Sequence, residues 1–92
     1  MRPGRRWESD ELELVVEEYM RMLADIRSQK PVNKLATARS LAECLGRTRS
    51  AVEYVWGNIS YVLHTNGREW MEGEPPRGHA SKLLTQIVTR LA

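Results

Sequence analysis

NKLATARSLAECLGRTRSAVEYVWGNISYVLH, residues 33–64, is the stretch that decides the fold. Gly46 divides it into two segments, each with apolar residues at helical spacing, and Asn33 and Thr48 are suitable N-caps. Because glycine readily takes the left-handed conformation that ends a helix, we expect helices over 34–45 and 49–64. A short helix, a tight turn and a second amphipathic helix have the outline of a helix-turn-helix. Many helical bundles contain such a corner, so the outline by itself fits a structural role equally well.

Two more helices are expected outside this stretch. Ser9 is the expected cap of a helix over 10–28, and a last helix over 80–91 carries apolar residues on one side. Between the third and last helices lies a long loop with Asn66-Gly67 and Pro75-Pro76. The prediction is an all-α fold: a small helical bundle with a three-helix helix-turn-helix core, a long loop and a C-terminal helix.

Length and composition bound the organisation of the chain. Ninety-two residues, 41% of them hydrophobic and 28% charged, predict one folded domain over 9–92 after a basic flexible arm over 1–8. The sequence has neither a membrane-spanning run nor a secretory signal, so we expect a cytoplasmic protein without membrane contact. The single cysteine, Cys44, falls among apolar positions and is expected to be buried and inert.

Charge is distributed unevenly along the chain although the net charge is only +2. Residues 8–25 contain seven acidic residues and one basic residue, whereas residues 27–53 contain six basic and two acidic ones. Such a division would orient the domain towards a polyanion. Charge runs of this kind also occur simply as solvated helix faces.

The outward face of the helix over 49–64 is unusual for a solvated surface. Opposite its apolar stripe lie Ser50, Tyr54, Gly57 and Tyr61, with Asn58 beside them. Glycine inside a helix costs about 1 kcal/mol relative to alanine, which indicates that something approaches the backbone closely there. Tyrosine and asparagine can contact base edges, and asparagine matches the paired donor and acceptor of adenine. We therefore predict that these five residues face bases in the major groove of double-stranded DNA.

Basic and hydroxyl side chains border this face. Phosphate contacts are expected from the positions around the turn and on the preceding helix, namely Lys34, Arg39, Arg47, Thr48 and Arg49. The arginines of the N-terminal arm could reach a minor groove or act only as a solubilising tail. The same Tyr/Asn/Gly face could instead receive another protein.

Catalysis finds little support in the sequence. His64 and His79 are separated by a turn-rich loop and lack metal-ligand spacing to a cysteine or carboxylate, so neither a metal site nor another cofactor is expected. No nucleophile motif or phosphate-binding glycine loop is present. We expect a chain that is not itself an enzyme.

Two families share parts of this pattern. The segments Trp7–Leu12 and Leu45–Val52, the latter leading into Trp56, resemble the tryptophan-bearing three-helix domains of the Myb/SANT type. A closer resemblance, over nearly the whole chain, is to the N-terminal helical module of bacterial HNH-type restriction endonucleases. Its matching pieces are Trp7–Leu14, Asn33-Lys34, Ala38–Leu41, Leu45–Thr48, Ser50–Tyr54, Asn58–Leu63 and residues 67–76.

The second resemblance implies the head domain of a modification-dependent restriction enzyme. Such a domain helps to recognise DNA that is methylated or otherwise modified, and a neighbouring nuclease domain is its natural partner. The alternative is a protein-interaction module, in which the apolar side of the last helix and Trp70 form a homodimer interface or a seat for another domain. Leu83 beside Leu84 widens that apolar side.

Overall fold

The computed structural model describes residues 6–78 and 80–92. The chain forms four α-helices: α1 (Ser9–Arg27), α2 (Lys34–Leu45), α3 (Arg49–Thr65) and α4 (Lys82–Leu91). No strand occurs in the described residues, so the all-α fold predicted from the sequence is confirmed. None of the described helices is both long enough and apolar enough to cross a membrane.

Local side-chain chemistry places the starts of the helices. Asn33, Thr48 and Ser81 each accept a hydrogen bond from the backbone N–H three residues later, which satisfies a donor that the helix leaves free. The cap of α1 was predicted wrongly. It is Glu8 and not Ser9, because the Glu11 carboxylate accepts a hydrogen bond from the Glu8 N–H at 2.9 Å. The last helix begins two residues later than expected, after its Ser81 cap.

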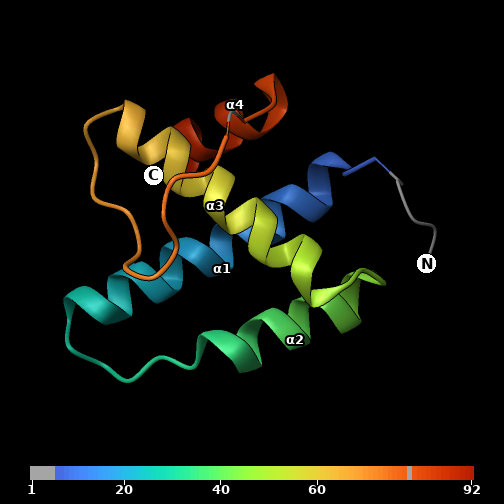
Figure 1. The fold of residues 1–92 in the computed structure, drawn as a ribbon, viewed down its shortest axis with the longest axis horizontal. Coiled ribbons are helices and arrows are strands. Elements are labelled where there is room, and N and C mark those ends of the chain that lie inside the picture. The colour runs from blue at the N-terminus through green and yellow to red at the C-terminus, as the bar shows by residue number, and fades with distance from the viewer. Residues whose placement is uncertain (1–5, 79) are drawn as a thin grey trace.

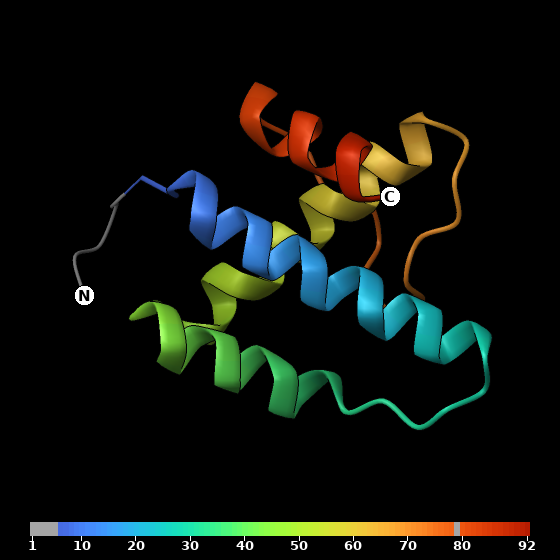
Figure 2. The ribbon, with the colours of Figure 1, turned by 180° about the vertical axis from the view of Figure 1, so that it is seen from behind.

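α1 and α3 cross at the centre of the molecule (Figure 1). Seen from behind, α1 lies between α2 on one side and α4 on the other, and α1 and α2 run antiparallel (Figure 2). The core fills the space between the four helices with fully buried side chains, the largest of which are Trp56, Tyr19, Met22, Ile59, Leu63 and Met71. Burial of this apolar surface provides the main driving force for folding.

A polar contact inside the core fixes the segment that links α3 to α4, residues 66–81, here called the crossing loop. The buried Tyr19 hydroxyl lies 2.7 Å from the Ser60 hydroxyl and accepts a hydrogen bond from the Met71 N–H at 2.8 Å. The Met71 side chain is fully buried. Burial raises the pKa of the Tyr19 phenol, because a phenolate in the core would lose its hydration, while the hydrogen bonds with Met71 and Ser60 oppose this shift.

The expectation for Cys44 differs from the structure. Cys44 is exposed, since it lies on the α2 edge that borders a shallow hollow against α1 and not on the buried stripe. Residues 1–5 of the predicted flexible arm lie outside the described residues. Trp7, just ahead of α1, is half-buried and packs against the core.

Candidate nucleic-acid interface

The corner between α2 and α3 has the geometry of a tight helix-helix turn. Gly46 ends α2 in the left-handed conformation (φ 64°), and the Arg47 N–H then donates to the Ala42 carbonyl at 2.9 Å. Thr48 follows as the cap of α3 and accepts from the Ala51 N–H at 3.1 Å. The predicted caps and turn of this corner are confirmed. The first turn of α3 therefore projects directly from the corner.

One side of the first two turns of α3 is open to solvent. The Arg49 side chain is 46% exposed and lies 3.6 Å from the Glu53 carboxylate, a helical i,i+4 pair of the weak surface type. Ser50 is exposed, and Tyr54 is 52% exposed although it is a large aromatic residue. Arg39 is exposed on α2. These four residues lie where a DNA-contacting surface was predicted.

The crossing loop covers the middle of α3. The Arg77 N–H donates to the Gly57 carbonyl at 3.1 Å, and a Cβ on Gly57 would lie only 2.9 Å from the Arg77 Cβ. Something does approach Gly57 closely, as the glycine indicated, but it is the chain itself. The prediction that Gly57 faces a base is therefore wrong, because its backbone is buried under the loop.

Asn58 and Tyr61, the remaining residues predicted to contact bases, are less accessible to solvent than Ser50 and Tyr54. Asn58 is partly exposed, but its Oδ1 atom is buried and no described residue donates a hydrogen bond to it. The amide therefore cannot offer its paired donor and acceptor to adenine as predicted. Tyr61 is half-buried and lies one turn past the point where the loop crosses the helix.

Arg47 does not act as an exposed phosphate contact. Its side chain is 6% exposed, and its guanidinium pairs with the Glu11 carboxylate at 2.9 Å. The same group lies 3.8 Å from the centre of the Trp7 ring, a cation–π contact, and donates to the Arg6 carbonyl. The prediction for Arg47 is wrong because the side chain turns inwards and links the corner to the start of α1.

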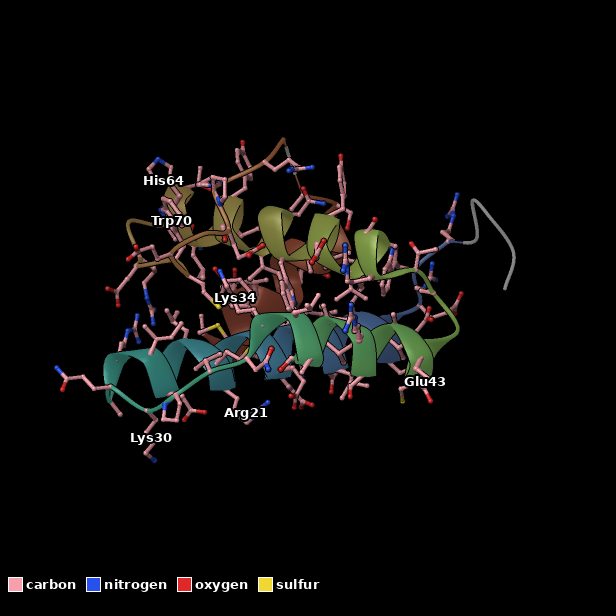
Figure 3. The ribbon with its side chains drawn as sticks, turned by 60° about the horizontal axis from the view of Figure 1, so that its bottom comes forward. Arg21, Lys30, Lys34, Glu43, His64 and Trp70 are labelled. Carbon is pink, nitrogen blue, oxygen red and sulfur yellow. The ribbon has the colours of Figure 1, made fainter. Side chains whose placement is uncertain are left out.

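Lys34 is also engaged within the molecule. Its ammonium donates to the Glu72 carbonyl at 2.9 Å and to the Glu74 carboxylate at 3.2 Å. Figure 3 shows Lys34 at the start of α2, on the side that faces the crossing loop. Lys34 therefore holds the loop against α2, and its charge is offset by Glu74, so it does not serve as the free phosphate contact that was predicted.

Arg77 is the residue on this surface that sequence reasoning missed. Its guanidinium lies over the Tyr54 ring at 5.6 Å from the centroid. Between α3 and the loop is a polar hollow of about 480 Å³, lined by Ser50, Glu53, Tyr54, Gly57, Gly73, Glu74, Pro75 and Arg77. Gly57 signalled a close approach, but nothing in the sequence identified the approaching segment.

The described residues contain no group of three or more His, Cys, Asp or Glu side chains placed to hold a metal ion. His79 lies outside the described residues. Comparison of the chain with protein-family models, curated proteins and solved structures finds no match in any of the three.

Proposed function

We propose that this chain binds double-stranded DNA by placing the first two turns of α3 in the major groove. The observation that carries the proposal is the exposure of Arg49, Ser50 and Tyr54 directly after a tight helix-helix corner. In helix-turn-helix proteins the N-terminal residues of the second helix contact base edges. The part of α3 that the crossing loop leaves open is therefore the part such docking requires.

Each contact has a role that follows from its chemistry. Arg49 and Arg39 hold phosphates, together with the Thr48 hydroxyl at the start of α3. Ser50 and Tyr54 face base edges. Tyr61 is left out, because the loop over Gly57 would keep DNA away from the following turn.

The resemblance to the N-terminal module of HNH-type restriction endonucleases makes modified DNA the specific partner to test. In this proposal the chain supplies recognition, and a neighbouring nuclease domain would supply hydrolysis.

Fluorescence anisotropy with short labelled duplexes, unmodified and methylated, tests the proposal. Arg49→Ala should weaken binding and lower the slope of log K against log salt by about 1, because one phosphate contact is lost. Arg21→Ala is the matched control, since Arg21 is 54% exposed on α1 and pairs with Glu18 and Asp25. Absence of binding to any duplex at low salt, or an equal loss in both variants, would contradict the proposal.

A second candidate function is protein interaction through the N-terminal end of α4. Leu83 is 37% exposed beside a largely apolar hollow of about 430 Å³, lined by Arg6, Trp7, Leu12, Ser81 and Leu83. On the apolar side of α4, Leu84, Ile87 and Val88 are buried in the chain's own core, and Leu91 and Trp70 are partly buried against that core. Light scattering over a concentration series tests self-association. A mass that rises with concentration in the wild type and stays constant in Leu83→Lys would favour it, whereas a constant wild-type mass would exclude it.

A further inference from the structure

The crossing loop is held at two points, one on either side of Pro75: at the start of α2 before it and on α3 after it. Lys34 binds the Glu72 carbonyl and the Glu74 carboxylate, and the Arg77 N–H binds the Gly57 carbonyl. Backbone contact at Gly57 is close because no Cβ stands between helix and loop. The position of Arg77 relative to the open turns of α3 is therefore set by the fold.

Arg77 and Tyr54 form a pair on the surface. Both residues are exposed, and the guanidinium lies over the ring at 5.6 Å from its centroid, within the range of a cation–π contact. A guanidinium that lies over a ring still has N–H groups that point away from the ring and can bind paired acceptors. The Arg77 side chain is thus partly ordered before it meets any ligand.

The charge of Arg77 is available to a ligand. Among the described residues, no carboxylate lies within ion-pair distance of its guanidinium, whereas Glu53 and Glu74 in the same hollow pair with Arg49 and Lys34. An oriented arginine without an ion-pair partner, next to an exposed helix end, is suited to a group that presents two acceptors side by side.

We propose that the crossing loop is a second DNA-contacting element and that Arg77, which lies over the Tyr54 ring, binds a paired acceptor of the duplex bound by α3. This inference rests on the proposed function and adds to it a residue on a separate segment of the chain. The acceptor pair is either O6 and N7 of guanine or two oxygens of a phosphate, both of which accept a bidentate arginine.

Three variants separate this role from a structural one. Arg77→Ala should weaken duplex binding about tenfold, as expected for the loss of one good bidentate contact. Arg77→Lys should recover only part of this, because lysine keeps the charge but not the planar pair of donors. The matched control Arg68→Ala removes an exposed arginine from the other end of the same loop and should leave affinity unchanged.

Gly57→Ala tests the positioning of the loop without removing any charged group. The added methyl forces Arg77 away from α3, so affinity should fall as in Arg77→Ala, while circular dichroism should show the helices retained. Replacing guanines one at a time by 7-deazaguanine identifies the source of the acceptors. If the contact is to guanine, one such replacement should weaken the wild type but not Arg77→Ala. If the contact is to phosphate, no 7-deazaguanine replacement should weaken binding. Arg77→Ala should instead lower the slope of log K against log salt by about 1.

The outcomes distinguish this inference from the proposed function. Binding that Arg49→Ala weakens and Arg77→Ala leaves unchanged would overturn the inference alone. Absence of any duplex binding by the wild type would overturn both. An equal loss of affinity in Arg77→Ala and Arg68→Ala would also overturn the inference. It would show that any lost positive charge on the loop weakens binding to the same extent.

Discussion

The guanidinium of Arg47 pairs with the carboxylate of Glu11 at 2.9 Å, with only 6% and 9% of the two side chains exposed. Trp7 lies against the same guanidinium. This contact joins the corner between α2 and α3 to the first turn of α1, so the corner is held from outside as well as by its own caps. Arg47, which the sequence predicted to be a phosphate contact, thus helps to hold α3 in place.

Arg47→Ala should destabilise the domain by about 3 kcal/mol, because removal of one partner leaves the other charge buried. Urea denaturation monitored by circular dichroism measures this. Arg49→Ala, two residues away and half-exposed, is the control and should change the free energy of unfolding by less than about 0.5 kcal/mol. Similar stabilities of the two variants would show that the Arg47–Glu11 pair does not hold the corner.

Tyr19→Phe should cost about 1–3 kcal/mol, because the Met71 N–H loses its acceptor inside the core. The variant should also weaken the attachment of the crossing loop, because the loop is anchored in the core at Met71. Hydrogen exchange of the Met71 amide measures this locally, and thermal unfolding measures it globally. Unchanged protection of that amide would mean that the hydroxyl does not hold the loop.

Alkaline pH should weaken the contribution of Tyr19. The buried phenol has a pKa raised above its ordinary value of about 10, so the unfolded chain releases this proton at lower pH than the native one. The contribution is fully present below about pH 10 and is lost as pH rises further. The stability difference between wild type and Tyr19→Phe should therefore be constant up to that pH and then shrink. A difference independent of pH from 9 to 11 would refute the prediction.

Cys44 should react readily with a thiol reagent in the native protein, because its side chain is exposed. Ellman's reagent should label it at a rate near that of the denatured chain. The double variant Ala38→Cys, Cys44→Ser is the control, since position 38 on the same helix is fully buried and should react only through unfolding. Equal protection of the two thiols would place Cys44 in the core.

Much of the fold could be predicted from periodicity and caps. The 3.6-residue spacing of apolar positions identified all four helices, and Asn33, Gly46 and Thr48 placed the ends of two of them within a residue, because each acts through local backbone chemistry. The cap of α1 was missed because serine is a common N-cap and glutamate is not. Glu8 caps the helix only together with Glu11, in a capping box.

The site was harder to predict because it depends on contacts between distant segments. Arg47 and Arg49 look alike in the sequence, yet one pairs with Glu11 in the interior and the other is open to solvent. Gly57 and Arg77 meet only after the crossing loop folds back over α3. The local sequence pattern gives no information on such pairings. The predicted base-contacting residues therefore included positions that the chain itself covers.

An NMR titration of the isotope-labelled protein with a short duplex at low salt tests the central claim most directly. We predict that the amide chemical-shift changes are concentrated in residues 48–54 and 73–78. The outward acidic side of α1 around Glu17 should be unaffected. Shifts centred on Trp7 and Leu83, or a spectrum that the duplex leaves unchanged, would contradict it.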